Sequence, residues 1–227
     1  SRPAALLERK FATALRAAVT DDLPAEALIP DHRLGCKRIL ISNDWYPTLH
    51  RPNVSVVTVP IDRITPTGVV AGGIEHPVDT LVFGTGFAST GFLAPIRVIG
   101  RDGLDLHEVW EGGAEAHLGI TVPGFPNLLL LAGPGTGLAH GGSLIFVAEC
   151  QVRYVSRLLV EMTERDLDAL EVRRAVMDES IRRFDAAHRE LVWAHPGMRN
   201  WYRNAAGRVF APMPWRLVDY WTMTREP

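Results

Sequence analysis

The glycines that follow an apolar run in the middle of the chain are residues whose type and spacing could serve chemistry. Five of them fall between Gly133 and Gly142, after the apolar residues 128–132 and before an apolar segment that starts at Leu144. Glycine costs roughly 0.5–1 kcal/mol relative to alanine within a regular element. A strand, a glycine loop and a helix, in this order, bring backbone N–H groups and the positive end of a helix close to an anion such as a nucleotide. The loop matches neither G-x-G-x-x-G nor G-x-x-x-x-G-K-[ST], so a tight turn without a ligand is an equal alternative.

A second glycine pair, Gly84 and Gly86, flanks Thr85 directly after the apolar residues 78–83. By itself, this G-T-G favours a turn or a β-bulge. Two glycine-rich strand ends in one chain nevertheless favour a shared ligand at the carboxyl edge of one sheet.

Lys37 and Arg38 are the third candidate, because an arginine keeps its charge near neutral pH and can stabilise an anion. Taken alone, a Lys-Arg pair in a loop indicates an ordinary solvated pair of charges. The residues by themselves therefore leave both interpretations open.

Apolar periodicity predicts the elements that would position these residues. Spacings of three and four residues predict an amphipathic helix over 4–19, a long helix over 144–162 and a further helix within 167–192. Residues 88–126 are expected to form loops with short elements. Three apolar runs are predicted to be buried strands, namely residues 53–60, 78–83 and 127–133. The last run is apolar throughout, as in a parallel sheet that is covered on both faces.

Composition excludes several classes of protein. A formal net charge of -2 gives no electrostatic footprint for a nucleic acid or an anionic membrane, and neither partner is expected. No apolar run reaches the ~20 residues of a membrane span. Cys36 and Cys150 lie far apart and form no C-x-x-C, which argues against a structural zinc site and suits a reducing cytoplasm. The histidines show no i, i+4 pair, so no metal is expected.

Four motifs, in this order along the chain, resemble the later half of flavin-containing monooxygenases, and the Baeyer–Villiger type is the most similar branch. They are GCKRILISNDWYPTL (35–49), VDTLVFGTGF (78–87), AHLGITVPGFPNLLLLAGPGTGL (116–138) and NWYRNAAGRV (200–209). The resemblance extends over residues 28–227. Each motif alone is unspecific, whereas the ordered series is specific.

This resemblance implies an α/β fold, as part of a two-dinucleotide-binding-domain (Rossmann-like) flavoprotein with a helical and irregular C-terminal extension. Residues 1–75 would end the NADPH-binding domain, 76–163 would form the C-terminal part of the FAD-binding domain, and 164–227 would form the extension. The G-x-G-x-x-G loops that the family uses for FAD and NADPH do not occur in this sequence. The expected partner is therefore a missing N-terminal half of the same enzyme, and the chain alone is expected to be inactive.

The resemblance also implies FAD and NADPH as cofactors, with O2 and a small ketone as substrates. In the family, NADPH reduces the flavin, and a C4a-peroxyflavin inserts one oxygen atom next to the carbonyl. By position, Arg38 would be the catalytic cation that stabilises the peroxide, and Lys37 would meet the 2′-phosphate of NADPH. The other cofactor-binding residues implied are Thr85, Gly86, Phe87, Gly133, Pro134, Gly135, Thr136, Gly137, Leu138, Trp201 and Tyr202. For Trp201 and Tyr202, ordinary surface packing is an equal alternative to closure over bound NADP.

The sequence departs from the family pattern in the glycine loop, where Gly135 stands in place of an amide side chain. The loop's flavin contacts are therefore open to question. Three alternative functions remain: an N- or S-oxygenating flavin monooxygenase, another flavoprotein with two dinucleotide domains, and a non-catalytic remnant that acts as an interaction module.

Overall fold

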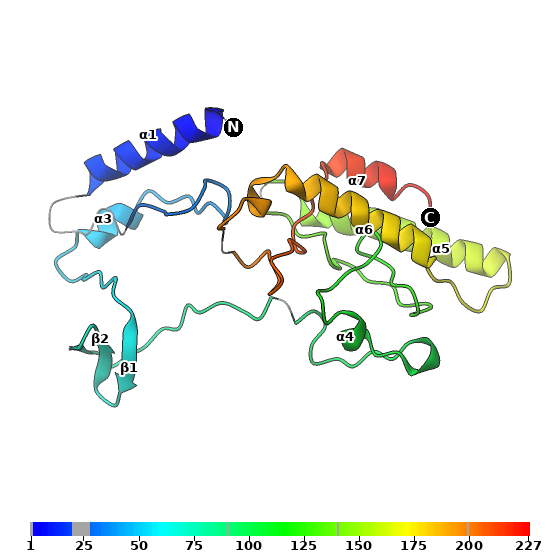
Figure 1. Cartoon of the computed structure of the whole chain (residues 1–227), viewed down its shortest axis with the longest axis horizontal. Coiled ribbons are helices and arrows are strands. Elements are labelled where there is room, and N and C mark those ends of the chain that lie inside the picture. Colours follow the sequence, from blue (N-terminus) through cyan, green and yellow to red (C-terminus); the bar gives the residue numbers. More distant parts are fainter. Residues whose placement is uncertain (1, 20–27, 90, 140, 199) are drawn as a thin grey trace. The chain divides into compact units, whose positions relative to one another are not determined.

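The computed structural model of the chain describes residues 2–19, 28–89, 91–139, 141–198 and 200–227. The chain forms two compact units, and each is described by itself (Figure 1). The first unit comprises Ser1–Leu34 and Leu40–Phe87, and the second comprises Gly35–Ile39 and Ala88–Pro227. The short segment 35–39 thus belongs to the second unit, although the residues directly before and after it belong to the first.

The first unit begins with the amphipathic helix that the sequence predicts. This helix, α1, spans Arg2–Ala18. The side chain of Leu15 is buried, whereas that of Phe11 is exposed. A short helix, α3, follows at Trp45–Leu49 and buries Leu49. The prediction of a helix is confirmed, but its apolar face is only partly covered within this unit.

A small antiparallel sheet completes the first unit, and its strands follow one another in the order β1, β2, β3. The strands are β1 at Ile61–Thr65, β2 at Gly68–Ala71 and β3 at Ile74–Pro77. The β2–β3 turn consists of Gly72 and Gly73, whose φ angles are +57° and +78°. Glycine adopts this left-handed backbone without the steric cost that a side chain would add.

The predictions of buried strands at residues 53–60, 78–83 and 127–133 are wrong for this chain, because none of them is a strand in the structure. A strand exists only when its backbone N–H and C=O groups pair with a neighbour, and no such ladder forms for these residues within the described part of the chain. Burial differs from the prediction in residues 78–83, where Val82 is 91% exposed, whereas Leu130 is buried as expected. The apolar composition of these segments indicated a propensity for strands, but it does not supply the neighbouring strand that pairing requires.

In the second unit, the two long helices follow the predicted periodicity. Helix α5 spans Leu144–Glu164, α6 spans Arg174–Arg189, and a shorter helix, α7, spans Leu217–Met223. Helices α5 and α7 pack against each other, as Figure 1 shows. Val147 of α5 and Tyr220 of α7 belong to one buried apolar cluster at this contact.

The described residues of 88–126, namely 88–89 and 91–126, form loops with short elements, as expected. They contain a 3-10 turn, η1, at Arg101–Gly103 and the one-turn helix α4 at Leu106–Val109. Asp105 caps α4 by accepting a hydrogen bond from the backbone N–H of His107 at 2.9 Å. Trp110 follows α4 and packs in a buried apolar cluster, which gives this loop region a core of its own.

The sheet within the described residues is antiparallel, so the parallel sheet that the sequence suggested is not formed there. The division of the chain at residues 75 and 163 between two nucleotide-binding domains stays a prediction. Among the helices described, none is long and apolar enough to cross a bilayer.

Candidate functional site

The segment that carries the predicted catalytic arginine is a turn fixed to the second unit. Gly35 has a φ of +85°, and its carbonyl accepts a hydrogen bond from Nε1 of Trp193 at 3.1 Å. Cys36 is fully buried, while Lys37 and Arg38 are exposed. The turn therefore hides a thiol and presents two cations to solvent.

Arg38 brings together three segments that are distant in sequence. Its Nη2 donates a hydrogen bond to the carbonyl oxygen of Leu138 at 3.0 Å. Burial raises the pKa of the Tyr202 phenol, and the Arg38 guanidinium beside it opposes that shift. The Tyr202 hydroxyl is itself buried and has no hydrogen-bond partner within the described residues. The structure thus assembles Arg38, Leu138 and Tyr202 into one cluster, which we call the arginine cluster.

Of the predicted aromatic pair, one ring is buried and the other is accessible. Tyr202 is only 1% exposed and packs with Trp193 and Val209. Trp201 is 49% exposed, and its ring centroid lies 4.3 Å from that of Tyr202. Tyr202 therefore contributes to packing as well as to the arginine cluster, whereas the face of Trp201 is available to a partner.

The glycines of the predicted flavin loop have a packing role inside the protein. A Cβ on Gly133 would collide with the carbonyl oxygen of Gly119, and a Cβ on Gly135 would lie 2.7 Å from Cε2 of Phe184. A Cβ on Gly137 would lie 2.9 Å from the carbonyl oxygen of Ala211. The close approach that these residues permit is, at each of the three positions, an approach of the chain to itself.

Other atoms of the same loop fix its path. The buried hydroxyl of Thr136 donates to the carbonyl of Gly133 at 2.7 Å. The backbone of Gly137 donates to the Ala211 carbonyl at 3.0 Å, and its own carbonyl accepts from Met213 N at 2.8 Å. The loop is therefore held to the C-terminal tail before it reaches Leu138.

After this loop, the chain enters α5 through an exposed N-terminus. Gly141 and Gly142 have φ angles of +57° and +90°. Ser143 caps the helix, since its Oγ accepts a hydrogen bond from Phe146 N at 3.2 Å. Leu144 is 52% exposed, so the first turn of α5, with its positive dipole end, faces solvent.

The second predicted glycine site lies in the first compact unit. Thr85, Gly86 and Phe87 are all exposed, and a Cβ on Gly86 would meet nothing within 4 Å. Gly86 has a φ of +81°, which accounts for a glycine at this position. Within the described residues of their unit, these residues make no contact that would assign them a role.

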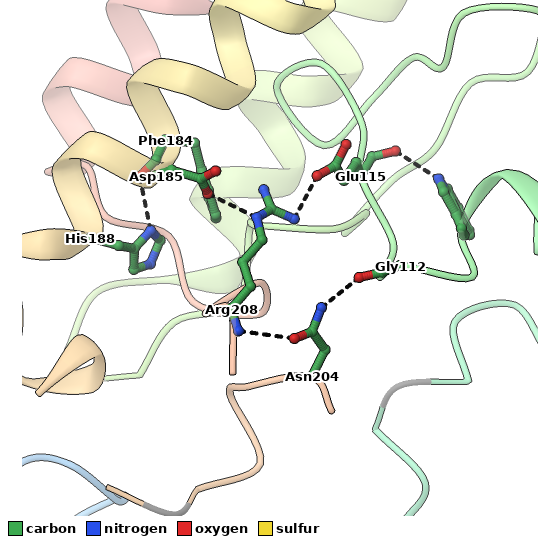
Figure 2. A network of polar contacts seen from close by, with 8 residues as sticks. Gly112, Glu115, Phe184, Asp185, His188, Asn204 and Arg208 are labelled. Atoms are coloured by element: carbon green, nitrogen blue, oxygen red, sulfur yellow. Dashed lines mark hydrogen bonds and ion pairs between the residues drawn. The ribbon is translucent and has the colours of Figure 1, made fainter. Parts of the chain in front are cut away.

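A charged network near the tail was not predicted from the sequence (Figure 2). Arg208 forms ion pairs with Glu115 and, at 2.9 Å, with Asp185 of α6. Asn204 donates to the carbonyl of Gly112 at 2.6 Å and accepts from Arg208 N at 2.9 Å. Burial raises the pKa of Glu115 although Arg208 opposes the shift. Arg208 thereby fastens the tail that follows Tyr202 to two other parts of the unit.

Next to this network lies a cavity of about 620 Å³. Among the residues predicted to bind a cofactor, Pro134 and Gly135 contribute to its lining, whereas Arg38 and Leu138 do not. His117 also lines it, and burial together with Arg183 lowers the pKa of that imidazole. The cavity is therefore distinct from the arginine cluster.

Sequence reasoning missed the residues that hold the arginine cluster in place. Asn200 donates from Nδ2 to the carbonyl of Cys36 at 3.3 Å, and Trp193 donates to Gly35. Asn200 and Cys36 each stand inside a motif of the family resemblance, directly beside a residue that was singled out. Their position next to those residues was the one signal in the sequence that could have identified them. The contact itself joins positions 164 residues apart, so no local pattern indicates it.

Comparisons with known proteins agree with the resemblance seen in the sequence. No protein-family model matches the chain. The chain is 38% identical to the uncharacterized monooxygenase y4iD of Sinorhizobium fredii over 201 residues. This alignment covers 88% of this chain and 30% of that protein. It is 39% identical over 199 residues to a protein of Pseudomonas aeruginosa named Baeyer–Villiger monooxygenase, covering 87% of this chain and 38% of that protein.

The fold is likewise similar to solved monooxygenase structures. A crystal structure of OTEMO in complex with FAD and NADP matches with a TM-score of 0.88 and 26% identity, over 99% of this chain and 42% of that chain. The chain therefore spans well under half the length of the relatives that it matches. The proteins matched here are monooxygenases by name, so this is the class that the chain resembles. The predicted resemblance to flavin-containing monooxygenases of the Baeyer–Villiger type is confirmed.

Proposed function

We propose that the chain is part of an FAD- and NADPH-dependent monooxygenase that inserts one oxygen atom of O2 into a ketone. The observation that carries the proposal is the arginine cluster, in which Arg38, Leu138 and Tyr202 converge from three distant segments. The relatives named above support the proposal, since one is named Baeyer–Villiger monooxygenase and one solved structure holds FAD and NADP.

The residues present fit a pyridine dinucleotide. Lys37 and Arg38 are exposed cations on a rigid turn, and cations of this kind suit the phosphates of NADPH. The Tyr202 hydroxyl is buried beside the Arg38 guanidinium and has no hydrogen-bond partner within the described residues. Trp201 offers an accessible ring for stacking. We assign these four residues to NADPH binding.

The flavin is assigned to the glycine loop and to the start of α5. Gly133–Leu138 would approach the flavin through backbone groups, and the exposed first turn of α5 would stabilise negative charge on its pyrimidine end. Thr85, Gly86 and Phe87, which are exposed in the first unit, are likewise assigned to cofactor binding.

When bound, FAD and NADPH supply the electrons and the activation of O2. The chain's own contribution is a permanent positive charge beside the reacting atoms. Arg38 cannot lose its proton near neutral pH, and its hydrogen bond to the Leu138 carbonyl uses one of five N–H donors. The remaining donors can orient the nicotinamide and stabilise negative charge as it develops on oxygen.

The partner in this proposal is the remaining length of the relatives, as an N-terminal half of the same enzyme. Residues 78–83 support this, since they form no strand ladder with the described residues, and Val82 and Phe83 are 91% and 69% exposed. Unpaired apolar segments of this kind are templates for additional strands. The domain boundaries at 75 and 163 and a cytoplasmic location remain parts of the proposal.

The test is the ratio of ester formed to NADPH consumed, measured after the chain is combined with an N-terminal portion that supplies the two dinucleotide-binding loops. Arg38→Ala should retain flavin, yet lose about 10²–10³ in oxygen transfer and release hydrogen peroxide instead, because one charge contact in such a site is worth roughly 3–4 kcal/mol. Arg38→Lys should rescue poorly, since an ammonium lacks the planar fork.

The matched control is Arg157→Ala, which removes an exposed arginine of α5 and should leave the ratio unchanged. An unchanged ratio in Arg38→Ala would refute the role of Arg38. Products from ketones, sulfides and amines decide the substrate class, and exclusive N- or S-oxidation would overturn the assignment to ketones.

A further inference from the structure

The side-chain amide of Asn200 connects the turn that carries Arg38 to the residue that lies beside its guanidinium. Its Nδ2 donates to the carbonyl oxygen of Cys36 at 3.3 Å and lies 3.2 Å from the Cys36 Sγ. Its Oδ1 accepts a hydrogen bond from the backbone N–H of Tyr202 at 3.1 Å. One amide therefore contacts both Cys36, in the turn that carries Arg38, and Tyr202 of the arginine cluster.

The chemistry of this contact requires an amide. It uses a donor and an acceptor at the same time, and among side chains of this size only asparagine carries both in one planar group. An aspartate would keep the acceptor but place a charged oxygen against the Cys36 carbonyl. An alanine would leave the buried backbone of this turn without its partner.

A second contact holds the same turn from the other side. Trp193, in the 3-10 turn η2 at Val192–Ala194, donates from Nε1 to the Gly35 carbonyl at 3.1 Å. Its ring packs edge-on against Tyr202 with a centroid distance of 6.0 Å. Arg203 fixes Trp193 in turn, since its Nε donates to the Trp193 carbonyl at 2.9 Å.

These contacts fix the backbone only up to Cys36, and Arg38 follows two residues later with an exposed side chain. A long exposed arginine has many rotamers, so it keeps one orientation only if its backbone and its acceptors are fixed. One acceptor is the Leu138 carbonyl, and the adjacent surface is Tyr202, whose backbone Asn200 holds.

We propose that Asn200 is a positioning residue that acts through Arg38, by locking the Gly35–Arg38 turn to Tyr202 so that the guanidinium faces Leu138. The proposal rests on the function proposed for Arg38. The structural part, a lock between the two segments, can be tested in the chain without any cofactor.

The first experiment measures the reaction rate of the Cys36 thiol with an aromatic disulfide reagent, in a Cys150→Ser background that leaves one reporter. Cys36 is fully buried, so it reacts only when the turn opens. Asn200→Ala and Asn200→Asp should both raise the rate by about tenfold, because each removes the donor contacts to Cys36.

The matched control is Asn204→Ala, which removes another bridging amide, to Gly112 and Arg208, in the same segment. It should change the Cys36 rate less than about twofold, as expected for an opening that does not involve this turn. Equal rates in the Asn200 and Asn204 variants would overturn the lock. Such a result would mean that Cys36 reports general loosening of the tail.

The second experiment is a double-mutant cycle on the ester-to-NADPH ratio in the combined enzyme. Asn200→Ala should lower the ratio, and should lower it little further when Arg38→Ala is already present, because both changes act on one group. Additive losses would overturn the proposal, since Asn200 would then act by another route. If Arg38→Ala alone left the ratio unchanged, the proposed function would fail, and the Cys36 rate would still decide the lock.

Discussion

Gly135 offers a test of whether the glycine loop is shaped by packing or only by backbone conformation. In Gly135→Ala, the new Cβ would lie 2.7 Å from Cε2 of Phe184, at a φ of +77°. The left-handed backbone costs an alanine roughly 1–2 kcal/mol. The overlap with the ring adds about 1–3 kcal/mol, as is typical of overpacking.

Gly207 is the matched control, because its φ of +81° is nearly the same and a Cβ there meets nothing within 4 Å. Gly207→Ala should therefore cost only the backbone part, about 1–2 kcal/mol. The difference between the two variants, about 1–3 kcal/mol, measures the contact with Phe184. At roughly 2–4 °C per kcal/mol for a chain of this size, calorimetry resolves it.

A double variant, Gly135→Ala with Phe184→Leu, should recover part of the loss of Gly135→Ala, because the smaller side chain makes room for the Cβ. If Gly135→Ala and Gly207→Ala proved equally costly, the argument that the loop packs on Phe184 would be wrong. The loop's glycines would then reflect turn geometry alone.

Two further predictions concern charge in the second unit. Arg208→Met should lower the free energy of unfolding by about 2 kcal/mol, between the values for exposed and buried ion pairs, because Glu115 and Asp185 lose their countercharge. Denaturant titration should show a much smaller effect of Arg208→Met when Glu115→Gln is present, and additive losses would contradict the network. His188 has its pKa lowered from 6.5 by burial, with Arg208 also lowering it and Asp185 opposing. Its contribution to stability is therefore present above pH 6.5 and is lost as the pH falls towards the lowered pKa. His188→Asn should reduce the loss of unfolding free energy between about pH 7.5 and pH 5.5, and an unchanged loss would show that His188 is not its source.

The sequence predicted those parts of the chain whose stabilising contacts are local. Helices α1, α5 and α6 lie where apolar periodicity placed them, because each helical hydrogen bond joins residues four positions apart. The ordered motifs also gave the resemblance to flavin monooxygenases, which the comparisons confirm. Neither result needs any knowledge of distant contacts.

Only the tertiary structure decided what depends on residues distant in sequence. The apolar residues 127–133 have the composition of a strand, yet a strand needs a neighbour, and the described residues provide none. Gly135 is small because Phe184, nearly fifty positions later, occupies the adjacent space.

The arginine cluster is the clearest case. From the sequence, Arg38 was one member of a charged pair in a loop, with a role that only the family resemblance suggested. The structure places its guanidinium on a carbonyl 100 residues away and fastens its turn through Asn200. Hydrogen bonds across such separations leave no periodic signal in the sequence, because they depend on how the whole unit brings its segments together. The sequence therefore determined the helices and the chemical types of the candidate residues, whereas their assembly into a site was decided by tertiary packing.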